Sequence, residues 1–216
     1  MIQTPTYLAE TRIAYDTVAA DYAETLKDAL AAAPLERALL GTFAELVQAG
    51  GGGPVVDVGC GPGRITTYLD GLGLDVSGVD LSPEMVAVAR RVCPGVPFQV
   101  GTMTDLDLAD GALAGLVAWY SVIHTPPEHL PLVFAEFARV LSPGGQLMMA
   151  FQVGDEKVRV EQAYGHAVAA DAYRLPPDRV ADLLAAAGFE VTARVVRQMD
   201  GPFEKTPQAY LMARLT

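Results

Sequence analysis

The segment VVDVGCGPGRITTYL, Val55 to Leu69, joins a short apolar run to three alternating glycines. The run Val55–Val58 has the composition of a buried strand, and helical spacing resumes with Ile65, Tyr68 and Leu69. A glycine-rich turn between a strand and a helix is typical of sites for nucleotide-like ligands. The segment therefore predicts a ligand site at the end of a strand, and its neighbours decide which ligand.

Two phosphate-binding motifs do not fit this turn. A P-loop needs the pattern G-x-x-x-x-G-K-[ST], but Gly59, Gly61 and Gly63 are two residues apart and no lysine follows. A dinucleotide fingerprint, G-x-G-x-x-G, needs its third glycine at position 64, which is Arg64. The glycines alone therefore predict neither a triphosphate nor a dinucleotide.

Two acidic residues narrow the choice of ligand. Asp57 precedes the first glycine by two residues, where a carboxylate repels a pyrophosphate and attracts an ammonium group, directly or through water. Asp80 follows Gly59 by 21 residues, at the end of the next expected strand, where an acid can accept both ribose hydroxyl protons. The sequence thus predicts a nucleoside that carries an amine and no phosphate.

The rest of the chain alternates between strand and helix patterns. Expected helices cover residues 16–30, 35–48, 130–141 and 177–187, with two others beginning at 64 and at Ser82, which is expected as an N-cap. Expected strands cover 55–58, 74–80, 96–101, 113–121, 144–153, 189–199 and 208–215. This alternation predicts an α/β fold with a doubly wound, mostly parallel sheet of seven strands between helical layers. The last two strands follow one another directly, so they predict an antiparallel edge hairpin.

Together these segments resemble the class I, Rossmann-like S-adenosylmethionine-dependent methyltransferases of the small-molecule type. The resemblance rests on Asp57-Val-Gly59-Cys-Gly61-Pro-Gly63, on GVDLSPEMVAVAR (78–90), on RVLSPGGQLMMAF (139–151) and on AAGFEV (186–191), in this order. It covers about three-quarters of the chain, from Val55 to Thr216. It implies S-adenosylmethionine as the cofactor and S-adenosylhomocysteine as its product.

The resemblance also implies roles for individual residues. The three glycines let the backbone approach the methionine part of the cofactor, Asp57 contacts its ammonium group, and Asp80 holds the ribose diol. Thr102 stands where the family often has an acid, so contact with the adenine amino group falls to Thr102 or Met103, with Asp105 a weaker alternative. The further cofactor contacts implied are Cys60, Arg64, Leu81, Met85, Thr102, Met103, Tyr120 and Ser121.

The catalytic side is expected after the fourth strand, where acceptors meet the methyl group in this fold. His124 is the general-base candidate there, because its ordinary pKa suits removal of a hydroxyl proton near neutral pH. An equal alternative is a histidine that packs beside the cofactor. His166 is a second base candidate, and His129 is expected on a helix surface. The Asn/Asp-Pro-Pro-Tyr pattern of nucleic-acid amine methylation is absent.

Two segments outside the core are expected to shape the site. Residues 1–50 are predicted to form a helical cap over a methyltransferase core at 51–216, and Tyr15 and Tyr22, seven residues apart, would close over the cofactor from one helix face. For Tyr22, packing in an aromatic core is an open alternative. The connection Val153–Pro177 is long, which predicts a lid or acceptor-pocket segment within one overall domain, with a plain surface excursion as the alternative.

Composition limits the function classes. The 216-residue chain carries a net charge of −11, which disfavours tight binding to nucleic acid or anionic membranes. It shows no signal peptide, transmembrane run or metal-ligand spacing, so a cytoplasmic protein with no metal is expected. The predicted function is methyl transfer to oxygen or nitrogen of a small molecule by a monomer or homodimer. A protein or RNA methyltransferase and a non-catalytic cofactor-binding protein are the alternatives.

Overall fold

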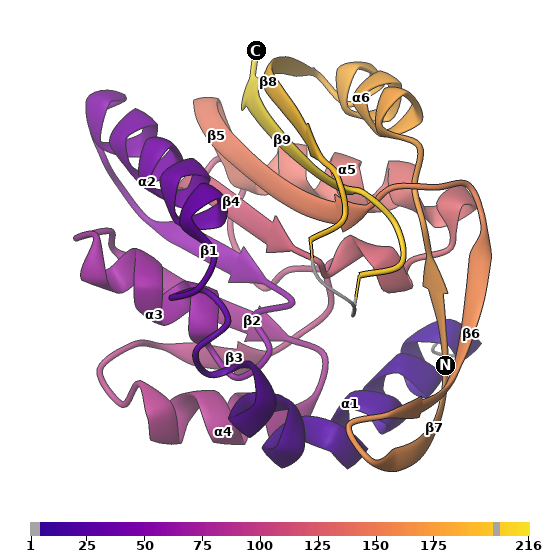
Figure 1. The fold of residues 1–216 in the computed structure, drawn as a ribbon. Coiled ribbons are helices and arrows are strands. Elements are labelled where there is room, and N and C mark those ends of the chain that lie inside the picture. The colour runs from indigo at the N-terminus through magenta and orange to yellow at the C-terminus, as the bar shows by residue number, and fades with distance from the viewer. Residues whose placement is uncertain (1–4, 201–203) are drawn as a thin grey trace.

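A seven-stranded mixed sheet forms the centre of the computed structural model, which describes residues 5–200 and 204–216 (Figure 1). Its strands are β1 (Val55–Val58), β2 (Val76–Asp80), β3 (Phe98–Val100), β4 (Leu113–Trp119), β5 (Leu141–Gln152), β8 (Phe189–Arg197) and β9 (Gln208–Leu215). They are ordered β3-β2-β1-β4-β5-β9-β8. The first five are parallel, and β9 is antiparallel to both of its neighbours. The predicted fold class, including the antiparallel edge, is confirmed.

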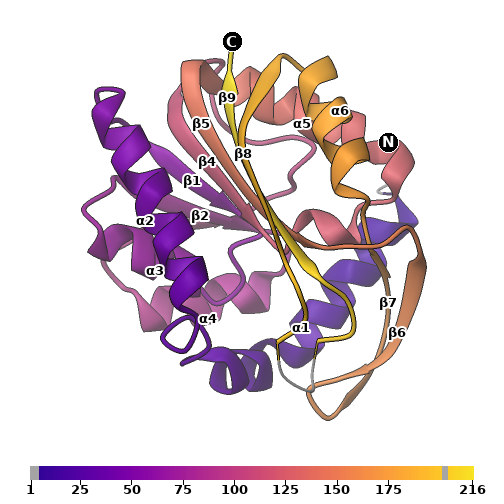
Figure 2. The ribbon, with the colours of Figure 1, turned by 45° about the horizontal axis from the view of Figure 1, so that its top comes forward.

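Helices cover both faces of this sheet (Figure 2). On one face lie α2 (Pro34–Ala49), α3 (Arg64–Gly71) and α4 (Pro83–Val92), and on the other lie α5 (Leu130–Val140) and α6 (Pro177–Ala186). The alternation of side chains along β5 divides the core between the faces: Leu147 and Met149 pack with α5, whereas Met148 packs with α2. The central strand β4 is apolar and buried along almost its whole length because both sides of the sheet are covered there.

One helix lies outside the three layers and crosses the carboxyl ends of β1 and β2. This helix, α1 (Thr6–Leu26), packs on α4, where Val18 and Ala19 meet Met85. The Ser82 hydroxyl donates a 2.6 Å hydrogen bond to Asp16 of α1 and also caps α4 by accepting from the Met85 amide, as the sequence predicted for this serine. The helix is therefore attached to the edge of the sheet where parallel strands of this kind present ligand sites.

A separate two-stranded hairpin covers α1 from the other side. It consists of β6 (Lys157–Ala163) and β7 (His166–Tyr173), and it lies beside α1 in Figures 1 and 2. The long connection after β5 was expected without strands. Its alternating pattern, with Val158 and Val160 on one face, and its Tyr164-Gly165 turn, with φ of 51° and 84°, are the signals that could have predicted the hairpin.

The N-terminal predictions need two corrections. The first helix begins at Thr6 rather than residue 16 and ends at Leu26 rather than residue 30. The sequence does not indicate the early start, because these turns face strand ends and the hairpin and carry no regular apolar stripe. Within the predicted cap over 1–50, α2 packs on the sheet through Leu40 and Phe43, whereas α1 and several residues of 29–36 line the cavities described below. Residues 1–4 of that predicted cap lie outside the described residues.

Candidate active site

The glycine turn brings the end of β1 close to the end of β4. Gly59 has a φ of 75°, and a Cβ added to it would lie 2.2 Å from Cβ of Ser121, which follows β4. Gly61 and Gly63 also have positive φ, and Gly63 directly precedes α3. Only glycine fits the first position, so the backbone of this turn forms one wall of a cavity without side chains in the way.

Asp80 fixes the other side of the same turn. Its carboxylate accepts a 2.7 Å hydrogen bond from the Gly61 amide and a 2.8 Å bond from the Ser82 amide. Burial raises the pKa of Asp80, and these two amide bonds oppose that shift. Because a carboxylate offers about four lone-pair positions, Asp80 can still accept hydrogen bonds from two hydroxyl groups.

Asp57 lies behind the turn, and its buried carboxylate is only partly hydrogen-bonded to the described residues. The side chain is buried, one carboxylate oxygen accepts a 2.7 Å bond from the Thr66 hydroxyl, and the other has no hydrogen-bond partner among the described residues. Burial raises the pKa of Asp57 from 3.8 to about 7. Asp57 is not on the cavity wall, so its contact with a bound ammonium group would run through a bridging water.

The cavity in front of the turn, here the inner cavity, lies between the sheet edge and α1 and measures about 740 Å³ including space open to solvent. Predicted residues on its wall are Tyr15, Tyr22, Gly59, Gly61, Asp80, Leu81, Thr102, Met103, Tyr120, Ser121 and His124. Sequence reasoning missed Tyr7, Leu8, Thr11, Arg12, Val58, Ser82, Gly101, Trp119 and Thr125. The first four of these belong to the first turns of α1, where no local pattern distinguishes a ligand contact.

Three residues expected to contact the cofactor lie instead in the core. Met85 is fully buried between α4 and α1, and Cys60 is buried under the helices of the α2 face. Gly63 makes room for the Phe98 ring, which a Cβ would approach to 3.0 Å. Arg64 lines a second cavity rather than the inner one. These positions therefore support the turn and the helix behind it.

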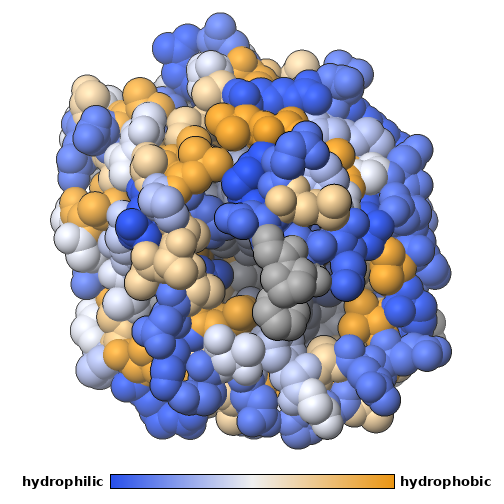
Figure 3. Space-filling view, in the orientation of Figure 1, coloured by the Kyte–Doolittle hydropathy of each residue, from blue (hydrophilic) through white to orange (hydrophobic). Residues whose placement is uncertain are grey.

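The second cavity, here the outer cavity, opens between α1, the β6–β7 hairpin and the ends of β5 and β9. It is larger, about 2130 Å³ including space open to solvent, and the molecule is hollowed near the centre of the face in Figure 3. Tyr15, Tyr22, Tyr120 and His124 belong to the walls of both cavities. These four side chains therefore mark the junction through which a group in one cavity can reach the other.

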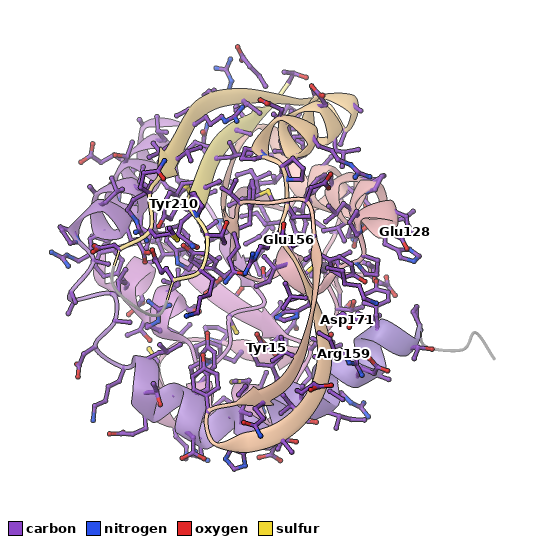
Figure 4. The ribbon with its side chains drawn as sticks, turned by 45° about the vertical axis from the view of Figure 1, so that its right-hand side comes forward. Tyr15, Glu128, Glu156, Arg159, Asp171 and Tyr210 are labelled. Atoms are coloured by element: carbon purple, nitrogen blue, oxygen red, sulfur yellow. The ribbon has the colours of Figure 1, made fainter. Side chains whose placement is uncertain are left out.

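His124 at the junction is held in one tautomer. Its Nδ1 lies 2.9 Å from the backbone carbonyl of Asp171 on β7, so this nitrogen carries the proton and donates. Its Nε2 lies 2.7 Å from the Tyr15 hydroxyl, which donates to it. Burial lowers the pKa of His124 and raises that of Tyr15, so both groups are neutral near pH 7. Figure 4 shows Tyr15 beside the hairpin that carries Asp171.

The other two histidines are elsewhere. His166 Nε2 lies 2.7 Å from an Asp21 oxygen on α1, its side chain is 38% exposed, and it lines neither cavity. The fold does not bring this predicted base candidate to the junction, because the hairpin end carries it past α1. His129 stacks on Tyr7 at a centroid distance of 5.4 Å and ends a short 3-10 helix (Pro127–His129) just before α5.

Among residues 5–200 and 204–216, no group of three or more His, Cys, Asp or Glu side chains is arranged to hold a metal ion. No helix in the described part of the chain is both long and apolar enough to cross a membrane.

Sequence comparison matches residues 55–145 to the family described as methyltransferase domain. An uncharacterised methyltransferase of Mycobacterium tuberculosis is 35% identical over 120 residues, which are 54% of this chain and 47% of that protein. A ubiquinone biosynthesis O-methyltransferase of Xanthomonas oryzae is 32% identical over 103 residues, 46% of this chain and 43% of the relative. The matches thus span about half the length of these curated relatives.

Solved structures share the fold over the whole chain. Magnesium protoporphyrin IX methyltransferase of Synechocystis, crystallised with S-adenosylmethionine, superposes with a TM-score of 0.73 at 16% identity over 100% of both chains. A Burkholderia thailandensis 1,6-didemethyltoxoflavin-N1-methyltransferase, crystallised with S-adenosylhomocysteine, gives a TM-score of 0.70 at 21% identity over 100% of this chain and 93% of that one. Residues 55–145 therefore match the methyltransferase domain family, and the chain has the Rossmann-like fold of class I S-adenosylmethionine-dependent methyltransferases.

Proposed function

We propose that this protein transfers the methyl group of S-adenosylmethionine to an oxygen or nitrogen atom of a small molecule. The inner cavity would hold the cofactor and the outer cavity the acceptor. The observation that carries this proposal is the junction, where His124 and three tyrosines line both cavities at once. A methyl group held at the junction from one side can meet a nucleophile held from the other.

The residues around the inner cavity fit this cofactor chemically. Asp80 would bind the ribose diol, and Leu81 and Met103 would pack on the adenine at the far end of the cavity. The buried oxygen of Asp57 and the buried hydroxyl of Ser121 both lack a partner among the described residues, and a ligand with an ammonium group and its water would satisfy them. When bound, S-adenosylmethionine supplies a methyl group activated by a positive sulfur.

His124 and Tyr15 would remove the proton of a hydroxyl acceptor. The acceptor hydroxyl donates to the Tyr15 oxygen, Tyr15 passes its own proton to Nε2 of His124, and the Asp171 carbonyl stabilises the resulting imidazolium through Nδ1. The low pKa of His124 keeps Nε2 free to accept that proton near pH 7. An amine acceptor that is already neutral would need this pathway only after transfer.

Two observations favour a small acceptor over a macromolecule. The net charge of −11 opposes docking of RNA, and the hairpin, which packs against α1, forms part of the wall of the outer cavity. A non-catalytic cofactor-binding protein would not require a neutral histidine at the junction of two cavities. The compartment and the oligomeric state stay predictions.

The proposal is tested first by ligand binding and then by turnover. S-adenosylhomocysteine should raise the melting temperature of the wild type, NAD should not, and Asp80→Ala should lose the shift. A metabolite panel scored by S-adenosylhomocysteine release should then find an acceptor. Stabilisation by NAD alone would reject the cofactor, and binding without transfer to any class of acceptor would favour the non-catalytic alternative.

A further inference from the structure

The inward face of β7 carries small apolar side chains and ends at an arginine. Ala170 and Ala172 line the outer cavity, and Arg174, one residue beyond the strand, continues the same row. We propose that Arg174 binds a carboxylate of the acceptor at this end of the outer cavity. The inference rests on the proposed function, because it takes the outer cavity as the acceptor site.

One edge of the Arg174 guanidinium makes no hydrogen bond to any described residue. Nη1 donates a 2.6 Å hydrogen bond to Glu156, whose side chain is half exposed and does not line the cavity. Nε is buried without a hydrogen-bond partner, and Nη2 has none either within the described part of the chain. The two N–H groups on the Nε–Nη2 edge point in parallel, which matches the two oxygens of a carboxylate. Glu156 holds the guanidinium in place and leaves this edge for a ligand.

The charge on the cavity wall differs from that of the whole protein. The chain has 15 basic and 26 acidic residues, whereas four basic and three acidic residues line the outer cavity. Arg197 on this wall is already neutralised by a paired contact with Glu204. Arg64 on the same wall forms no ion pair with any described carboxylate. In an otherwise acidic protein, this cavity is the favoured place for an anion.

The strand also sets the distance between the carboxylate and the reacting atom. His124 is anchored to the carbonyl of Asp171, and Arg174 follows three residues later. At about 3.3 Å per residue, the two points lie roughly 10 Å apart along the chain. The small side chains of Ala170 and Ala172 leave room for an apolar body between them. The acceptor is therefore an elongated molecule with its nucleophile at one end and its carboxylate at the other.

Calorimetric titration of the S-adenosylhomocysteine-saturated protein tests this site with three probes. These are 4-hydroxycinnamate, with its hydroxyl and carboxylate at opposite ends, its methyl ester, and 2-hydroxybenzoate, in which the two groups are adjacent. The wild type should bind 4-hydroxycinnamate at least about tenfold more tightly than either other probe, since one charge-assisted bidentate contact is worth that factor. Arg174→Gln should remove the preference and leave the affinity for the ester unchanged.

Arg159→Gln is the matched control. Arg159 lies on the outward face of the same hairpin, where it pairs with Glu10 and Asp171, and it lines neither cavity (Figure 4). This variant should keep the preference for the acid, so a general loosening of the hairpin is separated from the loss of one anion contact. Equal binding of acid and ester by the wild type, a preference that survives in Arg174→Gln, or no binding of any probe would overturn the inference.

Methyl transfer is measured separately with the same probes. Transfer to the ester as fast as to the acid would reject the carboxylate site and leave the proposed function standing. Binding of the acid that depends on Arg174, in a protein that neither binds S-adenosylhomocysteine nor transfers a methyl group, would reject the proposed function and leave the carboxylate site. The two ideas therefore fail in different measurements.

Discussion

Asp57→Asn should make the ligand-free protein more stable and its cofactor site weaker. The buried carboxylate of Asp57 has one oxygen bonded to Thr66 and one without a described partner. Asparagine has the same shape and can accept the Thr66 hydrogen bond through its carbonyl oxygen. The substitution therefore removes a poorly solvated charge and little else from the fold.

The magnitude follows from the pKa of Asp57. Its folded value of about 7 lies above the ordinary 3.8, so between these values the native state binds the proton more tightly than the unfolded state. Stability contributed by this group is therefore lost as pH rises from about 4 to about 7 and is constant above that. The difference of about 3 pKa units corresponds to about 4 kcal/mol in total, and to about 3 kcal/mol between pH 5 and pH 8.

Urea unfolding of both proteins at pH 5 and pH 8 measures this effect. The advantage of Asp57→Asn in free energy of unfolding should grow by about 3 kcal/mol from the lower to the higher pH. Fluorescence of Trp119, the single tryptophan and part of the inner cavity wall, reports S-adenosylhomocysteine binding, which should weaken at least about tenfold. An advantage that is independent of pH would refute the reasoning, because the charge would then carry no cost in the folded state.

Three other substitutions test the turn and the junction. Gly59→Ala places a Cβ at 2.2 Å from Ser121 on a backbone with a φ of 75°, so it should lower the free energy of unfolding in urea by about 3 kcal/mol. The control Gly71→Ala, with nothing within 4 Å of its Cβ, should not lower it. Equal effects of the two substitutions would contradict the close approach. Tyr15→Phe should lower turnover of a hydroxyl acceptor about 100-fold and leave S-adenosylhomocysteine affinity unchanged; unaltered turnover would exclude the relay to His124. His166→Ala should keep turnover within about twofold, since its bond is exposed and outside both cavities; a tenfold loss would restore it as a base candidate.

The parts of the fold that the sequence predicts are those specified by local chemistry. The glycine turn, Asp80 and the Ser82 cap depend on residues close together in the chain, and the structure contains all three at the predicted positions. The doubly wound fold class follows from alternating helix and strand patterns, which include every strand of the large sheet. Residues behind the turn are harder to assign. Met85 and Cys60 are apolar, which suits both a cofactor contact and core packing, and only the fold shows that they pack in the core.

The parts that the sequence does not predict depend on contacts between distant segments. His124 is the first base candidate in the sequence and His166 the second, and the contacts that separate them come from distant segments: β7 places a carbonyl beside His124, and Asp21 bonds to His166. The early start of α1 carries no apolar stripe because that surface faces cavities and the hairpin. The hairpin itself was readable from its alternation, but its packing against α1 was not.

The division between shared and individual parts of the chain explains why relatives indicate a cofactor more readily than an acceptor. The family match, 55–145, contains the glycine turn, Asp80, Thr102 and His124, whereas α1 and the hairpin lie outside it. Most residues on the wall of the outer cavity lie outside the family match, α1 and the hairpin among them, and α1 also contributes Tyr15 and Tyr22 to the inner cavity. Because the same helix borders both cavities, a ligand that orders α1 from the cofactor side removes part of the cost of ordering it for the acceptor. S-adenosylhomocysteine should therefore tighten acceptor binding, and by thermodynamic reciprocity the acceptor should tighten S-adenosylhomocysteine binding by the same factor.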